Sequence, residues 1–476
     1  MSRAPGSRAK VVLYNPDAVF FTLPLALVAV GSHLDPERFE VVIVDGRLEP
    51  DPQAAVLRHL GGALCLGVTV LTGAPIRDAV RISRAARAAR PDLPVVWGGW
   101  HPSLFPKECF QEPAVSVTVQ GQGESAFAEL VERMAAGRSL EGLPGCWTRG
   151  PDGEPGPGPL RPMEDINGFR PHDFGLLPME RYFALKGKRQ LDYITSQGCF
   201  FRCAFCADPF VYQRAWKGLE PARVGAEIEA AWRRWGFDDV NFQDETFFTY
   251  PRHVMGIAEE LTRRKLPVSW AATMRADQCA RLPDEVLETC RRSGLRRVLV
   301  GVESGSPETL ERIKKDITLD QVYLTAERCS RLGIKVQFPF IVGFPDEPAG
   351  SVQATLDVAK RLRAMDPAFE AHIFYFKPYP GSAITQEAVA RGYRLPATLD
   401  EWAEFDFIGS AGPWVTPETH RKVEGFKFYQ GLAFDRVPSW KKPAQWLARW
   451  RCRNDLYGLP LEKAVSERLS PPARLS

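Results

Sequence analysis

The stretch Ser196-Gln-Gly-Cys-Phe-Phe-Arg-Cys-Ala-Phe-Cys206 sets three cysteines, Cys199, Cys203 and Cys206, in the spacing C-x3-C-x2-C. Three thiolates this close on one loop can each bind a different iron of a cubane cluster, which leaves the fourth iron without a protein ligand. A zinc site or a redox dithiol is the alternative, although no fourth Cys or His lies nearby in the sequence. The spacing favours an iron–sulfur centre with one iron open to chemistry.

The cysteines follow the first of six apolar runs that alternate with helical patterns from residue 190 onward. Such alternation indicates a parallel sheet with covered faces. Six repeats are fewer than the eight of a closed (β/α)8 barrel, so we predict an open partial (β/α)6 barrel with its active site at the C-terminal rim. The expected strands are residues 191–196, 239–243, 268–273, 297–302, 336–342 and 371–376, with helices that include 221–235, 283–292 and 307–314.

The N-terminal part shows the same alternation and predicts a doubly wound, Rossmann-like α/β domain. Its expected strands are residues 11–15, 41–45, 63–69, 95–99 and 115–120. Small or polar residues follow nearly every strand, and loops at this edge form the ligand crevice of open α/β sheets. The candidates for ligand contact are Asn15, Thr69, Gly98, Gly99, His101, Gly121, Gly123 and Glu124, with a capping role as the alternative for His101.

Shifts in composition give the expected domain boundaries. Residues 139–188 are rich in Gly and Pro, which disfavours helix and central strand and predicts a linker. We therefore expect a Rossmann-like domain at 1–138, the linker at 139–188, the partial barrel at 189–382 and a mainly helical C-terminal region at 383–476.

The bulk properties are those of a multidomain globular protein. A net charge of +3 over 476 residues does not indicate a nucleic-acid partner. Since no apolar run reaches the length of a membrane span and no signal pattern opens the chain, we expect a cytoplasmic protein. The other seven cysteines are scattered and are expected to be isolated core or surface thiols.

The C-terminal region is aromatic and basic. It contains Trp402, Trp414, Trp440, Trp446 and Trp450, and from residue 437 onward it has eight Lys or Arg against three acids. A helical tail packed on the barrel is one interpretation of this composition. Peripheral contact with a lipid surface or an acidic partner is the other.

The cysteine motif, with an aromatic residue before its third cysteine, resembles the signature of radical S-adenosylmethionine (SAM) enzymes, and residues 190–382 resemble their core strand by strand. The resemblance implies that the three cysteines hold a 4Fe-4S cluster whose open iron binds the amino and carboxylate groups of SAM. It also implies a set of SAM contacts: Phe205 near the adenine, Asp244 and Glu245 toward the ammonium group, Arg275 toward the carboxylate, and Glu303 and Ser304 toward the ribose or methionine part.

A doubly wound domain before such a core resembles the group of radical SAM enzymes with a cobalamin (B12)-binding domain, and the glycine loops at 98–102 and 121–124 are typical of it. The motif D-x-H-x-x-G, which supplies a histidine ligand to cobalt in some cobalamin proteins, is absent. Members of the group are thought to hold cobalamin without that histidine, while others have lost the cofactor. His101 is then a candidate group on the cobalt or the substrate side.

This resemblance implies methylation of an unactivated carbon, in which a 5′-deoxyadenosyl radical abstracts hydrogen and methylcobalamin delivers the methyl group. Relatives on the same framework also perform ring formation, oxidation and carbon–carbon coupling. A non-enzymatic metal-binding module would not explain the polar residues at successive strand ends. A tRNA-thiomethylating enzyme would bring a basic domain and a second upstream cysteine triplet, which the sequence lacks.

The sequence indicates the substrate and the partners less closely than it indicates the fold and the cofactors. Aromatic residues expected at the barrel mouth, Phe374, Tyr375 and Tyr379, favour a small or hydrophobic substrate such as a lipid, isoprenoid or tetrapyrrole, with simple packing as their alternative role. The family resemblance also implies an electron donor such as flavodoxin or ferredoxin.

Overall fold

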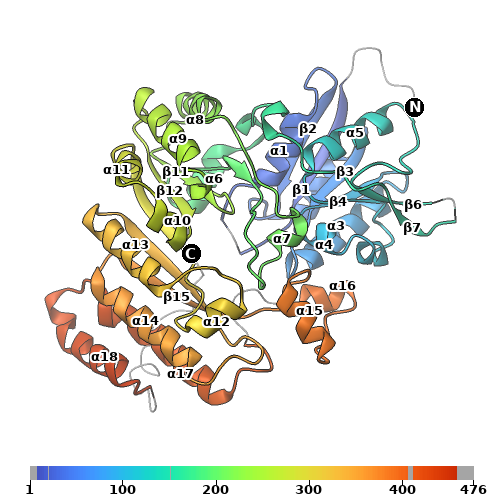
Figure 1. The fold of residues 1–476 in the computed structure, drawn as a ribbon. Helices are drawn as coiled ribbons and strands as arrows, with labels where there is room; N and C mark the ends of the chain where they lie inside the picture. The colour runs from blue at the N-terminus through green and yellow to red at the C-terminus, as the bar shows by residue number, and fades with distance from the viewer. Residues whose placement is uncertain (1–7, 20, 151, 406–410, 458–476) are drawn as a thin grey trace. The chain divides into compact units, whose positions relative to one another are not determined.

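The structure, a computed structural model, describes residues 8–19, 21–150, 152–405 and 411–457 (Figure 1). The described residues fall into two compact units. The first takes its residues from 1–200, 208–238 and 393–406, and the second from 201–207, 239–392 and 407–476. Both units are α/β, which agrees with the predicted fold class.

The first unit is built on a parallel sheet. Its strands are β1 (Ala9–Asn15), β2 (Phe39–Asp45), β3 (Ala63–Thr69), β4 (Val95–Gly98) and β5 (Val117–Val119), in the order β2-β1-β3-β4-β5. Since β1 pairs with both β2 and β3, the strand order reverses beside β1, and Asn15 lies level with Asp45. This reversal is the topological switch point at which such sheets bind ligands.

Helices cover both faces of this sheet, as a doubly wound fold requires. Alternate residues of β1 enter different cores: Val12 and Tyr14 pack with α2 (Pro52–His59) and α3 (Pro75–Ala89). Val11 and Leu13 pack on the other face with α1 (Leu25–His33) and α5 (Glu124–Ala135). The predicted Rossmann-like architecture is confirmed.

The segment expected to be a linker has regular structure. Two antiparallel strands, β6 (Cys146–Arg149) and β7 (Pro155–Pro157), extend the edge of the sheet. Proline is tolerated there because an edge strand leaves one row of N–H groups unpaired. Helix α6 (Met179–Lys186) is held to β2 by a hydrogen bond from the Tyr182 hydroxyl to Asp45 Oδ2 at 2.6 Å. The expectation that Gly and Pro would exclude helix from the whole segment was therefore wrong at α6.

A C-terminal segment also joins the first unit. Helix α16 (Leu399–Ala403) packs on α3, and Trp402, 1% exposed, enters the core that contains Trp97. The sequence placed this tryptophan in the C-terminal helical region, since a lone aromatic residue does not indicate which core it joins. The other elements of this unit are α4 (Trp100–Leu104), η1 (Glu108–Gln111), η2 (Ile166–Gly168), η3 (Phe174–Leu176), β8 (Gln190–Tyr193), β9 (Ser196–Gln197), α7 (Asp208–Val211), β10 (Lys217–Gly218) and α8 (Pro221–Trp235).

The second unit contains five parallel strands in the order β15-β14-β13-β12-β11. They are β11 (Asp239–Phe242), β12 (Ser269–Met274), β13 (Leu295–Val300), β14 (Lys335–Val342) and β15 (Phe369–Tyr375), each with bounds within two residues of those predicted. Between and after them lie η4 (Phe247–Thr249), α9 (Pro251–Arg263), α10 (Ala276–Arg281), α11 (Asp284–Arg292), α12 (Pro307–Arg312), α13 (Leu319–Arg331), α14 (Ser351–Met365) and α15 (Ala383–Ala390). The β/α repeats expected for this part of the chain are thus present.

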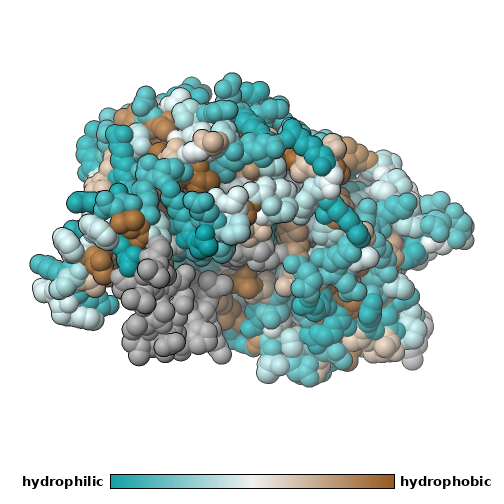
Figure 2. Space-filling view, turned by 90° about the horizontal axis from the view of Figure 1, so that it is seen from below, coloured by the Kyte–Doolittle hydropathy of each residue, from teal (hydrophilic) through white to brown (hydrophobic). Residues whose placement is uncertain are grey.

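The chain continues into α17 (Pro417–Phe434), η5 (Ser439–Lys441) and α18 (Lys442–Asn454), with α18 packed on α17 and α17 on α14. This confirms a helical C-terminal region. Lys463, Arg468 and Arg474 of the basic tail lie outside the described residues. No helix in the described parts of the chain is long and apolar enough to cross a membrane. On the face seen in Figure 2, hydrophilic residues predominate and hydrophobic ones are scattered.

Candidate functional site

The cysteine loop is anchored in the second unit by its own backbone. The Ala204 N–H donates to the carbonyl of Ile313 at 2.8 Å, and the Ala204 carbonyl accepts from Ile384 N at 3.0 Å. A turn closes where Cys206 N donates to the Cys203 carbonyl at 3.2 Å. These bonds fix the backbone that carries Cys203 and Cys206, whereas Cys199 belongs to the first unit.

Arg275 lies beside one of these sulfurs. It follows β12, is 7% exposed, and its Nη1 lies 3.5 Å from Cys203 Sγ. Nε donates to Asp277 Oδ1 at 2.9 Å, Nη2 donates to the Lys315 carbonyl, and the guanidinium lies 3.7 Å from the centroid of the Phe201 ring. The sequence assigned Arg275 to the SAM carboxylate, but the structure directs its donors to the cysteine loop and its neighbours.

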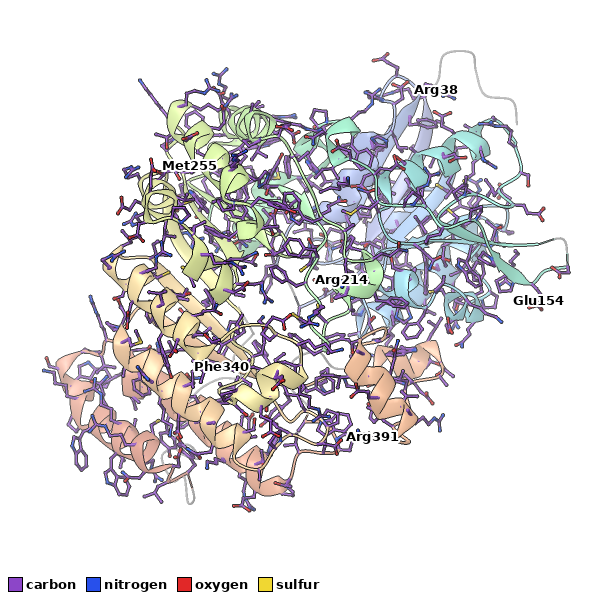
Figure 3. All side chains as sticks on the ribbon, in the orientation of Figure 1. Arg38, Glu154, Arg214, Met255, Phe340 and Arg391 are labelled. Carbon is purple, nitrogen blue, oxygen red and sulfur yellow. The ribbon has the colours of Figure 1, made fainter. Side chains whose placement is uncertain are left out.

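A buried ion pair stands next to this arginine. Lys315 Nζ lies 2.6 Å from Glu303 Oε1, and both side chains are less than a tenth exposed. Glu303 adopts a left-handed backbone with φ of 67° and forms a bridge to Phe340 of β14, which Figure 3 labels. A Cβ at Gly301 would collide with the Glu303 carboxylate and lie 2.8 Å from Lys315 Nζ. Glycine at 301 thus makes room for the pair.

Lys315 is a residue that sequence reasoning missed. Its ammonium lies 5.9 Å from the centroid of the Phe205 ring, and its carbonyl accepts from Arg275. It therefore joins three of the predicted SAM-site residues, Phe205, Arg275 and Glu303. Only its place after the Gly-Val-Glu-Ser-Gly motif could have drawn attention to it.

The remaining predicted SAM contacts differ in accessibility. Asp244 is 2% exposed and lies two residues after the end of β11, where its carbonyl accepts from Thr273 Oγ1 at 2.9 Å. Glu245 is half-buried. Ser304 is fully buried, with its hydroxyl 3.2 Å from Thr355 Oγ1 and accepting from Ser306 N at 3.1 Å. Those bonds favour a structural role for Ser304 and leave the acids as the stronger ligand candidates.

The donor set fits an iron–sulfur cluster in its chemistry. All ten cysteines lie among the described residues and none forms a disulfide, while the three of the motif are half-buried rather than core. The guanidinium of Arg275 faces Cys203 Sγ from within hydrogen-bonding reach. No group of three or more His, Cys, Asp or Glu side chains forms a ready-made metal site within the described ranges.

In the first unit, two of the residues predicted to contact a ligand end the strands beside the strand-order reversal. Asn15 ends β1 and Thr69 ends the neighbouring β3, and both are half-buried. Gly99 has φ of 96°, and a Cβ there would lie 2.8 Å from Thr69 Oγ1. Gly121 has φ of 62° and open space around its missing Cβ. Gly99 thus lets the chain pack closely against Thr69 and Val70, whereas Gly121 leaves open space that fits the approach of a ligand.

Two of the residues predicted to contact a ligand, Asn15 and Glu124, are engaged by the protein itself. Asn15 Nδ2 donates to Asp45 Oδ2 at 3.1 Å. Glu124 is 6% exposed, and its Oε1 accepts from Gln197 Nε2 at 2.7 Å. Gln197 Oε1 in turn accepts from Gln122 at 2.8 Å. Because Gln197 precedes Cys199 by two residues, this network ties the glycine loop to the start of the cysteine motif.

His101 is a core residue in this structure. Its side chain is fully buried, Nδ1 lies 3.2 Å from Thr72 Oγ1, and the ring packs against Phe105 and Trp402. Nε2 is buried without a hydrogen-bond partner among the described residues. This surrounding favours packing over the contact with a bound cofactor that the sequence suggested.

Burial at His101 predicts a stability loss in acid. Desolvation lowers the pKa of His101 from 6.5 to about 4, so the unfolded chain binds this proton at a pH where the folded chain does not. Stability should be complete above pH 6.5 and fall by about 3 kcal/mol as the pH drops to 4. Urea unfolding of the wild type and His101→Gln across this range measures the difference. An unchanged gap between the two proteins from neutral pH to pH 5 would contradict the prediction.

Comparisons with known proteins agree with this architecture. Residues 193–359 match the Radical SAM superfamily model, and residues 13–131 match the B12 binding domain model. An uncharacterized methyltransferase of Pyrococcus horikoshii is 29% identical over 80% of this chain and 82% of its own length. Anaerobic magnesium-protoporphyrin IX monomethyl ester cyclase of Rubrivivax gelatinosus is also 29% identical, over 68% of this chain and 58% of its own.

A solved structure shares the fold over nearly the whole chain. The radical S-adenosylmethionine methyltransferase TsrM from Kitasatospora setae, with tryptophan substrate and a SAM analogue bound, aligns with a TM-score of 0.74 at 20% identity. The alignment covers 91% of this chain and 92% of that one. The chain is therefore a radical SAM enzyme with an N-terminal B12-binding domain. Its two domains are of the types that bind the cofactors expected from the sequence, which are a 4Fe-4S cluster, SAM and cobalamin.

Proposed function

We propose that this enzyme methylates an unactivated carbon of a small or hydrophobic substrate, using a 4Fe-4S cluster, SAM and cobalamin. The observation that carries the proposal is the surrounding of Cys203, where a buried guanidinium faces the sulfur beside the buried Glu303. A B12-binding domain with glycines after two of its strands accompanies this site in the same chain. The name of the Pyrococcus relative, a methyltransferase, favours methyl transfer.

Each group of predicted site residues would bind a different cofactor. Cys199, Cys203 and Cys206 would ligate three irons, and Asp244 with Glu245 would accept hydrogen bonds from the SAM amino group. The predicted cobalamin contacts would be the crevice residues Asn15, Thr69, Gly98, Gly99, Gly121, Gly123 and Glu124. When bound, the cluster supplies the electron that cleaves SAM, and cobalamin supplies the methyl group.

Side chains around Cys203 set the charge and the polarity of the site. Arg275 holds positive charge against the Cys203 sulfur, and its bonds to Asp277 and Lys315 keep the guanidinium in place. Lys315 neutralises Glu303 at the next strand end. Phe205 and Phe344, with ring centroids 6.3 Å apart, supply apolar surface beside them. Such a wall excludes water from the reacting groups.

A radical SAM cyclase, oxidase or coupling enzyme is the second candidate. It is favoured by the cyclase among the relatives, since the same framework there carries a name without methyl transfer. Product analysis separates the two, because only a methyltransferase adds one carbon to the substrate.

We further propose an electron donor such as flavodoxin or ferredoxin and a cytoplasmic location. Ten cysteines outside disulfides suit a reducing compartment. Cluster reduction requires an external one-electron donor, since the described side chains offer none.

Replacing Arg275 should change the electronic properties of the cluster. Loss of a cationic hydrogen-bond donor to a ligating sulfur lowers the reduction potential, so Arg275→Gln is expected to shift it by tens of millivolts to more negative values. Arg281→Gln is the matched control, because Arg281 pairs with the same Asp277 at 2.6 Å but is 69% exposed. Redox titration followed by electron paramagnetic resonance measures both variants. Equal shifts in the two would assign the effect to Asp277 alone.

The test of the proposed function is a cobalamin titration. Anaerobically reconstituted protein is titrated with hydroxocobalamin, with iron and sulfide measured beside it and SAM cleavage measured afterwards. We expect stoichiometric cobalamin together with about four irons per chain. An intact cluster that cleaves SAM without binding cobalamin would overturn the methyl-transfer proposal and favour the second candidate.

A further inference from the structure

The C-terminal helix α18 presents tryptophans to solvent. Trp440, just before it, is 76% exposed, and Trp446 and Trp450 are 69% and 44% exposed. Trp446 and Trp450 are one turn apart and share a face, opposite the side of α18 that buries Ala448 and Cys452. A group of large, exposed aromatic side chains on one surface indicates a site of contact with a partner or a membrane.

Basic residues share this outward face. Lys442, Arg449 and Arg453 follow the same helical spacing as the two tryptophans, and all three are exposed. Lys441 Nζ lies 4.8 Å from the ring centroid of Trp440. Tryptophan interleaved with Lys and Arg is the composition of helices that lie at the boundary between water and lipid.

A basic pocket adjoins the face through Arg449 and Arg453. This cavity of about 910 Å³ lies between α14, the end of α17 and α18. Asp435 is its acidic lining residue, and Asp357 and Asp455 pair with Lys360 at its edge. The cations that line it are Lys360, Arg361, Arg363, Arg436, Arg449 and Arg453. Positive charge therefore exceeds negative charge by a wide margin.

One of these arginines has unused donors. Arg363 is 4% exposed, and its Nη2 pairs with Asp435. Its Nε and Nη1 are buried without a hydrogen-bond partner among the described residues. Buried guanidinium donors are usually satisfied, and a phosphate group, which accepts bidentate hydrogen bonds from arginine, is the natural complement.

We propose that the outer face of α18 and the adjoining pocket bind a membrane surface that contains anionic phospholipids, with a lipid phosphate in the pocket. Charge complementarity selects an anionic partner, and the exposed indole rings select the lipid interface. Since no helix of the described residues can span a bilayer, the contact is peripheral. The inference does not depend on the proposed catalytic function.

Vesicle co-sedimentation with the full chain tests this surface. Binding is measured on phosphatidylcholine vesicles with and without phosphatidylglycerol. We expect binding to the anionic vesicles, weakened by salt, and a loss of about tenfold or more in Arg449→Gln/Arg453→Gln. Trp446→Ala/Trp450→Ala should lose binding to a similar extent, because the rings insert at the interface. All four side chains are exposed, so both double variants should fold.

The control variant is Leu324→Ala/Arg252→Gln, which removes one exposed apolar and one exposed basic side chain from other helices of the same unit. It should bind anionic vesicles as the wild type does. Equal binding by all variants, no preference for phosphatidylglycerol, or binding to a single-stranded oligonucleotide instead of vesicles would each overturn the proposal.

Discussion

Replacing Cys203 with alanine is expected to remove the iron–sulfur cluster and abolish SAM cleavage. Two thiolates cannot hold a cubane whose fourth iron has no protein ligand, so iron should fall from about four per chain to background. The loop itself should persist, because its hydrogen bonds to Ile313 and Ile384 come from the backbone of Ala204. Iron and sulfide analysis, visible absorption and the yield of 5′-deoxyadenosine measure the outcome.

Cys290→Ala is the control for this substitution. Cys290 is a fully buried thiol on α11, outside the motif. Its replacement opens a small cavity and should leave the iron content unchanged. A Cys203→Ala protein that retained four irons and cleaved SAM would exclude the proposed ligand set.

Lys315→Met should destabilise the second unit strongly. The substitution leaves the Glu303 carboxylate buried without its partner, and both side chains are less than a tenth exposed. Breaking such a pair costs about 3–5 kcal/mol, most of it the penalty of an uncompensated buried charge. Urea unfolding measures the loss, and the affinity for SAM measured by calorimetry should fall with it.

Two further variants make this prediction specific. Lys314→Met changes the neighbouring lysine, which is exposed, and should alter stability by less than about 0.5 kcal/mol. Adding Glu303→Gln to Lys315→Met removes the unpaired charge and should recover much of the loss. If Lys315→Met were as mild as Lys314→Met, the ion pair would have no part in holding the site.

Several features could be predicted because they depend on local pattern. Helix α8 spans the predicted residues, and the strands of both units lie within a few residues of their predicted places. The alternation of apolar runs with helical periodicity depends only on neighbouring residues, so it can be recognised without knowledge of the fold. The same pattern predicted that Asn15 and Thr69 end neighbouring strands at one edge of the sheet, where the structure has them.

Other features depend on residues far apart in the chain. The guanidinium of Arg275 contacts Cys203, 72 positions away, instead of being left open for a ligand. His101 became a core residue because Trp402 of a distant helix packs on its ring. Gly and Pro predicted a linker at 139–188, but α6 is stabilised there by tertiary contacts such as that of Tyr182 with Asp45.

The sequence by itself predicted the cysteine motif as a ligand set and determined the two α/β domains, because motif spacing and hydrophobic period are properties of adjacent residues. Only the tertiary structure decided which groups face one another: Arg275 and Cys203, Lys315 and Glu303, and Arg363 and Asp435. The physical reason is that burial and electrostatic pairing arise when distant segments pack together. No local pattern specifies which distant side chain will contact a given residue.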